Sequence, residues 1–199
     1  MVAELLNANL AYRYARRRIR AAVGTAGAST PVSSGTPRKS RARAASRPMS
    51  AQEYLDLCGT RQALEVYAAG LVAQNRTDDQ LAELREPIEA MQRVLNQMGE
   101  RPADRAVLDD LIREDLRFHL CIVAIARNVW LVREVLRLRV VHRVVETAMR
   151  AKPIHTLAER HRIQADHEAI FAAIARGDPA AAKAAMERHL QHNPARFSS

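Results

Sequence analysis

From residue 50 onward, apolar side chains recur every three or four positions, with charged side chains between them. This is the period of an α-helix that turns one face to a core, and no stretch alternates strictly as a half-buried strand does. Helix start and stop signals divide the pattern into segments. The predicted helices cover residues 50–75, 77–99, 103–127, 129–151, 154–176 and 178–192. The sequence therefore predicts an all-α fold, an antiparallel bundle of about six helices with short connections.

The clearest helix starts are two capping boxes. Ser50 and Glu53 fit the S-x-x-E pattern, in which the first side chain and the fourth cap each other's backbone N–H groups. Thr77 and Gln80 repeat it at the start of the second predicted helix. Asn128 is a predicted N-cap for the fourth helix.

A Gly-Asp-Pro sequence separates the last two predicted helices. Gly177 suits the left-handed position that follows a helix, and Asp178 with Pro179 suits the N-cap and first position of the next. So short a connection predicts that these two helices pack as an antiparallel hairpin.

The fourth predicted helix is apolar on more than one face. One apolar stripe is enough to pack on a core, so a second indicates either a central place in the bundle or burial against another subunit. The residues concerned are Trp130, Leu131, Val135, Leu136, Leu138, Val140, Val141, Val144 and Val145. The second interpretation predicts a homodimer formed through the helical body.

The composition agrees with a helical, cytoplasmic protein. Apolar residues make up 48% of the chain and aromatic residues 4%, so the core is aliphatic, which favours helices over a β-sandwich. No apolar run reaches the roughly 18 residues of a membrane span. Cys58 and Cys121 have no C-x-x-C partner, which excludes a disulfide framework and a cysteine-based zinc finger and suits a reducing compartment.

The net charge of +9 is confined to the N-terminal quarter of the chain. Residues 1–50 hold ten bases and one acid, Glu4, whereas the rest of the chain holds 21 bases and 21 acids. The helical body is therefore not a nucleic-acid-binding domain by its charge, and any attraction to phosphate belongs to the first fifty residues.

Residues 1–47 are predicted to be a basic tail, separate from a helical domain at 48–193. Residues 24–50 are rich in Gly, Ser, Thr, Pro, Ala and Arg and hold too few large apolar side chains to fold, so we expect a largely disordered linker. The tail is either a solvated basic segment, an arm that binds DNA or RNA without sequence preference, or a transit peptide. The candidate phosphate-binding residues are Arg16, Arg17, Arg18 and Arg20.

Four ionisable residues lie on the apolar faces of three predicted helices. Asp115 and His119 are one turn apart in the third helix, so their side chains point to the same place. His167 lies on the apolar face of the fifth helix and His189 on that of the sixth, whereas His161 lies off it. All four side chains are thus aimed at the interior of the bundle.

A divalent metal is the partner that would satisfy all four groups at once. A single inward histidine is more often a hydrogen-bonded core residue, but a buried carboxylate beside three imidazoles needs a common counter-charge. Three imidazoles and one carboxylate suit Zn, Ni, Co or Mn. The alternative is a hydrogen-bonded polar core without metal.

The same residues carry a family resemblance. The matching segments are RQALEVYAAGLVA at 61–73, DLRFHLCIVAIARN at 115–128, DHEAIFAAIARGD at 166–178 and AKAAMERHL at 182–190. Their order and spacing resemble the FCD domain, the C-terminal effector-binding domain of FadR-type GntR transcriptional regulators. The helix count resembles the VanR-like group.

The resemblance implies a metal held by Asp115, His119, His167 and His189, with a small carboxylate effector bound at its open positions. It also places Arg61 where a guanidinium meets an effector carboxylate, the alternative being an intrahelical pair with Glu65. Members of the family dimerise and bind operators through an N-terminal winged helix-turn-helix. No recognition helix is visible in residues 1–47, so we expect only weak DNA binding by this chain.

The function expected is therefore ligand sensing by a metal-binding domain of a GntR-type transcriptional regulator, not catalysis. Two alternatives remain. One is a metal-dependent enzyme that acts on a small organic acid. The sequence offers no additional general base on the same helix faces as the four ligands, which argues against this alternative. The other is a nonspecific nucleic-acid binder whose basic tail is joined to a helical dimerisation module.

Overall fold

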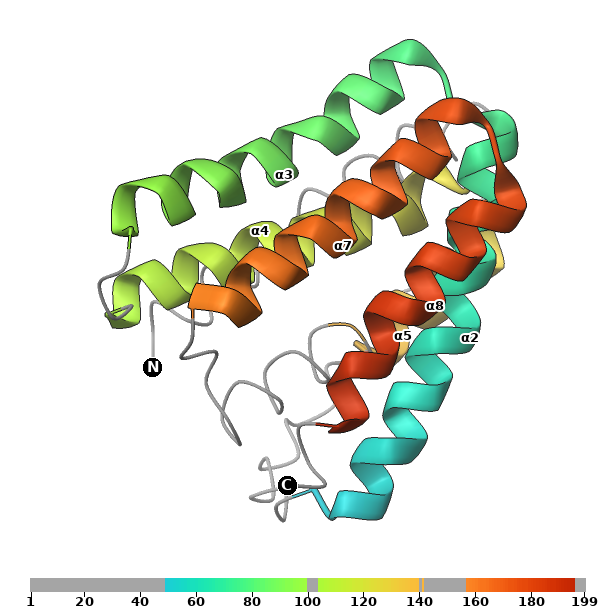
Figure 1. Ribbon diagram of the computed structural model, residues 1–199. Helices are drawn as coiled ribbons and strands as arrows, with labels where there is room; N and C mark the ends of the chain where they lie inside the picture. The colour runs from blue at the N-terminus through green and yellow to red at the C-terminus, as the bar shows by residue number, and fades with distance from the viewer. Residues whose placement is uncertain (1–48, 100–103, 140, 142–156, 196–199) are drawn as a thin grey trace, which may run out of the picture.

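The computed structural model describes residues 49–99, 104–139, 141 and 157–195, and these are all-α (Figure 1). The predicted basic tail at 1–47, with its arginines, lies outside the described residues, as do 142–156. The described helices are α2 (Ala51–Asn75), α3 (Asp78–Met98), α4 (Arg105–Ile125), α5 (Val129–Leu138), α7 (Leu157–Arg176) and α8 (Pro179–Ala195). The predicted helical bundle is thus confirmed over this part of the chain.

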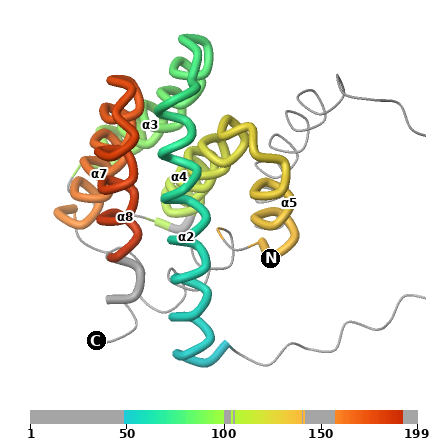
Figure 2. Tube along the Cα trace, turned by 90° about the vertical axis from the view of Figure 1, so that its right-hand side faces the viewer, coloured from blue at the N-terminus to red at the C-terminus, as the bar shows by residue number. Residues whose placement is uncertain are grey.

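The helices pack as antiparallel neighbours. α2 lies along α8, α3 lies along α4, and α7 folds back onto α8 (Figure 1). α2 also contacts α4 and α7, which brings the first helix of the described chain against the helices that carry the predicted site. The short α5 contacts α2 and α4 at the side of the bundle away from α7 (Figure 2).

Both predicted capping boxes are present. The Ser50 hydroxyl accepts a hydrogen bond from the backbone N–H of Glu53 at 3.2 Å, and the Glu53 carboxylate accepts one from the N–H of Ser50 at 2.9 Å. Thr77 and Gln80 make the same reciprocal pair at the start of α3. Each box satisfies N–H groups that the helix itself leaves unpaired, which is why these helices start where the sequence indicated.

The hairpin between α7 and α8 forms as predicted. Gly177 has φ +70°, a left-handed conformation that favours glycine, and the N–H of Asp178 donates to the carbonyl of Ala173 at 3.1 Å. The Asp178 carboxylate then accepts from the N–H of Ala181 at 2.9 Å and caps α8. This turn fixes the direction of α8 relative to α7.

The fourth helix is shorter than predicted. α5 begins after the predicted N-cap Asn128 but ends at Leu138 instead of near 151, because Arg139 has φ +50° and leaves the right-handed helical region. Its inner face packs Leu131, Val132 and Val135 into the core.

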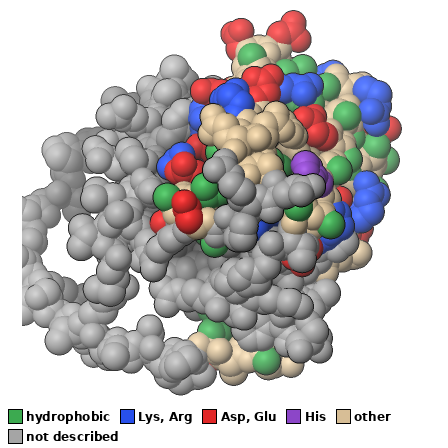
Figure 3. Space-filling view, turned by 60° about the vertical axis from the view of Figure 1, so that its left-hand side comes forward, with side chains coloured by type: hydrophobic (Ala, Val, Ile, Leu, Met, Phe, Trp, Pro, Cys, Tyr) green, Lys and Arg blue, Asp and Glu red, His purple; other side chains and the backbone are tan. Residues whose placement is uncertain are grey.

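The centre of the bundle is built from small and aliphatic side chains. Ala68, Ala69 and Ala73 of α2 are fully buried, which lets the neighbouring helices approach closely. Phe118 of α4 is fully buried among them. Acidic and basic side chains of the described residues are interspersed on the part of the surface that is coloured in Figure 3, so no charge of one sign gathers there. No helix in the described part of the chain has the length and apolar character needed to cross a membrane.

Candidate metal centre

The structure brings the four predicted residues together. Asp115 and His119 come from α4, His167 from α7 and His189 from α8, and one potential ligand atom from each lies within 4.8 Å of all the others. His119 and His167 are fully buried, and His189 is nearly so. His161 is exposed on another face of α7, as its position off the apolar stripe predicted.

The inner atoms of the cluster are close enough to share one partner. Nε2 of His119 lies 3.1 Å from Nε2 of His189, and Nε2 of His167 lies 3.3 Å from Oδ1 of Asp115. Nε2 of His119 is also 4.0 Å from the same oxygen of Asp115. Phe118 stands edge-on to His167, with 4.9 Å between the ring centroids, and closes one side of the cluster.

His167 is buried without a hydrogen bond to any described residue. Neither Nδ1 nor Nε2 has a hydrogen-bond partner among these residues, although Nε2 lies at ion-pair distance, 3.3 Å, from Oδ1 of Asp115. A buried imidazole that donates and accepts nothing loses its hydration without compensation, at a cost of about 1–3 kcal/mol. Such a group indicates that a partner belongs at the site.

Burial and neighbouring charges keep the cluster in the form that binds a cation. Burial lowers the pKa of His189 to about 3, and the nearby His167 adds to this effect, so the imidazole is neutral at pH 7. Burial likewise lowers the pKa of His167. Burial alone would raise the pKa of Asp115, but His167, His119 and Arg61 together hold it well below its ordinary value. The site therefore presents the neutral imidazoles of His167 and His189 beside one carboxylate.

The donor atoms fit a divalent ion. Ligands at about 2.1 Å around one metal lie about 3.0–3.4 Å from their neighbours in the coordination shell. Two of the inner distances, 3.1 Å and 3.3 Å, already have this value. The widest pair, within 4.8 Å, would have to close by up to about 1.4 Å to reach the upper end of this range. Nitrogen donors with one oxygen donor suit the metals expected from the sequence.

A carboxylate from α2 supports the cluster from outside. Oε2 of Glu65 lies 2.5 Å from Nδ1 of His119, and Oε1 of Glu65 accepts a hydrogen bond from Nε of Arg61 at 2.6 Å. Arg61 and Glu65 are both buried, so the intrahelical pair that the sequence left open is formed. Nη2 of Arg61 has no hydrogen-bond partner among the described residues.

The sequence did not reveal two residues that belong to this site. The sequence predicts Glu65 only as a partner for Arg61, although its place on the buried face of α2 is a signal that it meets another polar group. Asp166, next to His167 in α7, lies with Oδ2 3.7 Å from Nδ1 of His189. Only the packing of α2 against α4 and of α7 against α8 reveals these neighbours.

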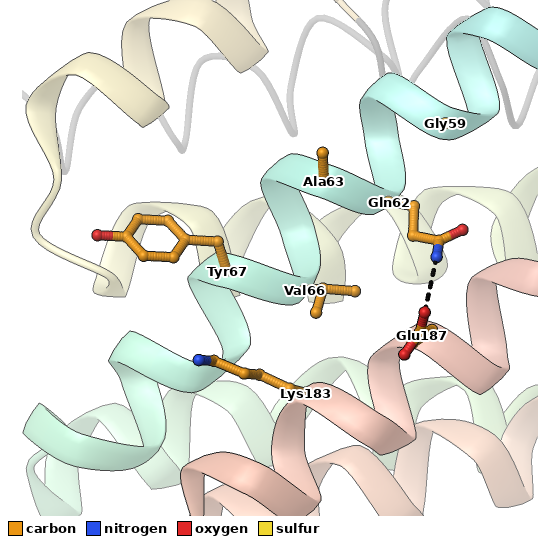
Figure 4. A pocket seen from close by; sticks show the side chains of 7 residues that line it. All are labelled: Gly59, Gln62, Ala63, Val66, Tyr67, Lys183 and Glu187. Atoms are coloured by element: carbon orange, nitrogen blue, oxygen red, sulfur yellow. Dashed lines mark hydrogen bonds between the residues drawn. The ribbon is translucent and has the colours of Figure 1, made fainter.

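A hollow lies on the outer surface between α2 and α8 (Figure 4). It has a volume of about 430 Å³ and is lined by Gly59, Gln62, Ala63, Val66, Tyr67, Lys183 and Glu187. The side chain of Gln62 donates to Glu187 at 3.0 Å, and Tyr67 is 48% exposed. None of the four clustered residues lines it, so it is separate from the candidate metal centre.

Comparison with known proteins shows the family to which the helical body belongs. A transcriptional regulator of Bacillus subtilis, the HTH-type transcriptional regulator LutR, is 30% identical over 154 residues, which cover 73% of this chain and 65% of LutR. The chain thus spans about two thirds of the length of that relative. Among solved structures, E. coli McbR/YncC has the same fold, with a TM-score of 0.62 and 19% identity over 76% of this chain and 70% of the other.

The sequence model of the FCD domain matches residues 56–192, which include every residue of the cluster. This match covers more than half of the chain, and LutR is a transcriptional regulator. The chain therefore belongs to the FCD domain family of GntR-type transcription regulators.

Proposed function

We propose that this chain is the sensing part of a GntR-type regulator, and that it binds a divalent metal through Asp115, His119, His167 and His189. The observation that carries the proposal is the pair of unpartnered nitrogens on the buried His167, beside a carboxylate and two further imidazoles. A metal held by these four residues would supply a Lewis acid, to which a small carboxylate effector could bind. The residues themselves orient the ion and exclude water from its inner side.

Arg61 is the proposed second contact for the effector. Its side chain is 2% exposed and its Nε is committed to Glu65, so it meets a ligand through Nη2, which is unpartnered among the described residues. Asp115 is close enough to raise the pKa of Arg61. A carboxylate that touches both the metal and Nη2 would therefore be held by two positive groups in a site of low dielectric constant.

The proposed regulatory role follows from the helices that carry the four metal-binding residues. The four groups come from three helices, so metal and effector binding favours one arrangement of α4, α7 and α8 over others. In a homodimer such a preference changes the spacing of whatever DNA-binding parts are attached, which is the coupling that a regulator needs. We assign sensing and dimerisation to residues 48–193, with nonspecific DNA attraction confined to residues 1–47.

The test is the metal content of the purified full chain. We expect about one divalent ion per chain after dialysis, and a fall in the melting temperature when a chelator removes it, because a ligand of the native state stabilises by about 2.7 kcal/mol at a hundred times its dissociation constant. His119→Ala should abolish stoichiometric binding. His161→Ala, a substitution in the exposed histidine of α7, is the matched control and should leave metal content unchanged.

The effector is tested on the metal-loaded protein. Calorimetric titration with small mono- and dicarboxylates should show binding that is lost on chelation and weakened in Arg61→Met. If no metal is retained or reloaded, and His119→Ala melts as the parent does, the four residues are a hydrogen-bonded polar core and the sensor proposal is wrong. Turnover of any of these acids would instead support the metal-dependent enzyme.

A further inference from the structure

Of the three clustered histidines, His119 is the one whose Nδ1 has a hydrogen-bond partner among the described residues. That partner is Oε2 of Glu65, at 2.5 Å, from a helix that supplies none of the four clustered groups. Nδ1 of His167 and Nδ1 of His189 have none. His119 is therefore held differently from the two histidines it faces.

Glu65 is itself fixed in place. Its other oxygen accepts from Nε of Arg61 at 2.6 Å, one helical turn earlier on α2, and both side chains are buried. Because one oxygen accepts from a guanidinium, Glu65 is held as a carboxylate, and its other oxygen faces Nδ1 of His119. An ionised carboxylate only accepts hydrogen bonds, so the proton between Glu65 and His119 resides on Nδ1.

We propose that Glu65, clamped by Arg61, is a positioning residue that fixes the tautomer and ring orientation of His119, so that its Nε2 lone pair points into the cluster. Nε2 of His119 is the atom that lies 3.1 Å from Nε2 of His189 and 4.0 Å from Oδ1 of Asp115. A ring fixed in this way binds a cation without first rotating or moving a proton, and outer partners of this kind typically contribute roughly 10–100-fold to metal affinity.

The inference rests on the proposed metal site, but its first test needs no metal. In the chelated protein, nitrogen chemical shifts of labelled histidine should show His119 as the Nδ1–H tautomer. Replacing Arg61 and Glu65 together, Arg61→Met with Glu65→Met, removes the acceptor and both buried charges while keeping similar volume. In this double variant the His119 signal should shift toward the Nε2–H tautomer or an average of the two.

The second test is metal affinity, measured by competition of zinc with a chromophoric chelator. The double variant should bind zinc roughly 10–100-fold more weakly than the parent, and Glu65→Gln, which keeps an amide oxygen as acceptor, should fall between them. The control is Glu89→Met with Arg93→Met, which removes an exposed pair with the same four-residue spacing on α3. That control should bind zinc as the parent does.

The outcomes separate the two proposals. If the parent binds zinc and the double variant binds it equally well, or if His119 in the parent is the Nε2–H tautomer, the positioning role is wrong and the metal site stands. If the parent binds no zinc while His119 changes tautomer in the double variant, Glu65 orients His119 within a polar core and the metal proposal fails. If the double variant does not fold, the His119 tautomer and the zinc affinity are measured in Glu65→Gln instead. Values equal to those of the parent would then overturn the positioning role.

Discussion

Nε2 of His119 lies 3.1 Å from Nε2 of His189, although the two residues are 70 positions apart in the chain. Two imidazole nitrogens at this distance must share either a proton or a cation, because two facing lone pairs repel each other. With Nδ1 of His119 paired to Glu65, its Nε2 is an acceptor. With the tautomer proposed for His119, His189 donates the proton between them in the metal-free protein, and an ion at the proposed site would replace that proton.

The stability of the metal-free protein should fall as the pH drops below about 6.5. Burial lowers the pKa of His189 to about 3, so below 6.5 the unfolded chain takes up a proton that the native state does not. His167 adds to the effect in the same direction. We expect a loss of roughly 1 kcal/mol per pH unit for each of these two histidines, measured by urea unfolding with chelator at pH 7 and pH 5.5.

His189→Gln should flatten this profile, and His161→Gln, at an exposed position, should leave it unchanged. The two carboxylates Asp115 and Glu65 also have lowered pKa values, but their contribution is lost only below about pH 5, which is outside this window. A profile that is level between pH 7 and 5.5 would show that the buried histidines titrate normally.

Gly177→Ala should destabilise the protein by about 1–2 kcal/mol. Gly177 has φ +70°, which strains any other residue, and a Cβ there would lie 3.0 Å from the guanidinium nitrogens of Arg76. That guanidinium donates to the carbonyl of Ala175 at 2.8 Å and holds the end of α7. Because the turn directs α8, the variant should also bind zinc more weakly.

Gly59→Ala is the matched control for this prediction. Gly59 lies inside α2, has no left-handed conformation, and its added Cβ would meet nothing within 4 Å. Alanine is a better helix former, so this variant should gain roughly 0.5–1 kcal/mol. Equal effects of the two substitutions on the free energy of unfolding would mean that the Gly177 turn is not required.

Local signals account for most of the fold that the sequence predicted. Ser50, Thr77, Asn128 and Asp178 cap helices where they were expected to, because a cap involves only residues a few positions apart. The end of α5 at Leu138 was missed. Arginine has a high helix propensity, so nothing local at Arg139 indicates a left-handed residue.

The site was predicted in part for the same reason. Helical periodicity is enough to place Asp115 and His119 on one inward face, and two further histidines on the inward faces of other helices. The contact between Glu65 and His119 joins residues 54 positions apart and depends on how α2 packs against α4. Periodicity gives the face on which a side chain lies but not the distance to a group on another helix.

We expect the helical body to form a homodimer in which Trp130 is covered. Trp130 is 67% exposed at the start of α5, next to the exposed Val129, and Arg133 places its guanidinium 4.9 Å from the indole ring. An exposed aromatic beside an arginine is typical of an interface. Since the chain holds one tryptophan, its fluorescence reports on this place alone.

Light scattering should give a dimer at micromolar concentration in high salt, and dilution should shift the tryptophan emission to longer wavelength. Trp130→Ala should weaken the dimer, and Tyr67→Ser, at the other large exposed aromatic on α2, should not. A stable monomer in light scattering would contradict the proposal and leave Trp130 as a solvent-exposed side chain.

Residues 1–47 should be dispensable for folding. The charge and composition change near residue 48, and the first described helix is capped by Ser50, which a chain that starts at Pro48 retains. We expect helical circular dichroism and a melting temperature within a few degrees of those of the full chain. A large fall in the melting temperature on truncation would show that the N-terminal residues pack on the body.

The same truncation should remove DNA binding. Residues 1–50 carry the whole net charge of +9, and residues 51–199 carry none, so the arginines of the tail supply any attraction to phosphate. Fluorescence anisotropy with two unrelated duplexes should give similar, weak affinities for the full chain. Each neutralised phosphate makes the slope of log affinity against log salt steeper by about 0.9. The affinity of a tail that contacts five phosphates should therefore fall roughly 500-fold between 50 and 200 mM salt.

Replacing Arg16, Arg17, Arg18 and Arg20 with Gln should make that slope less steep without changing the melting temperature. A strong preference for one duplex would instead require a base-reading element, which charge alone does not provide.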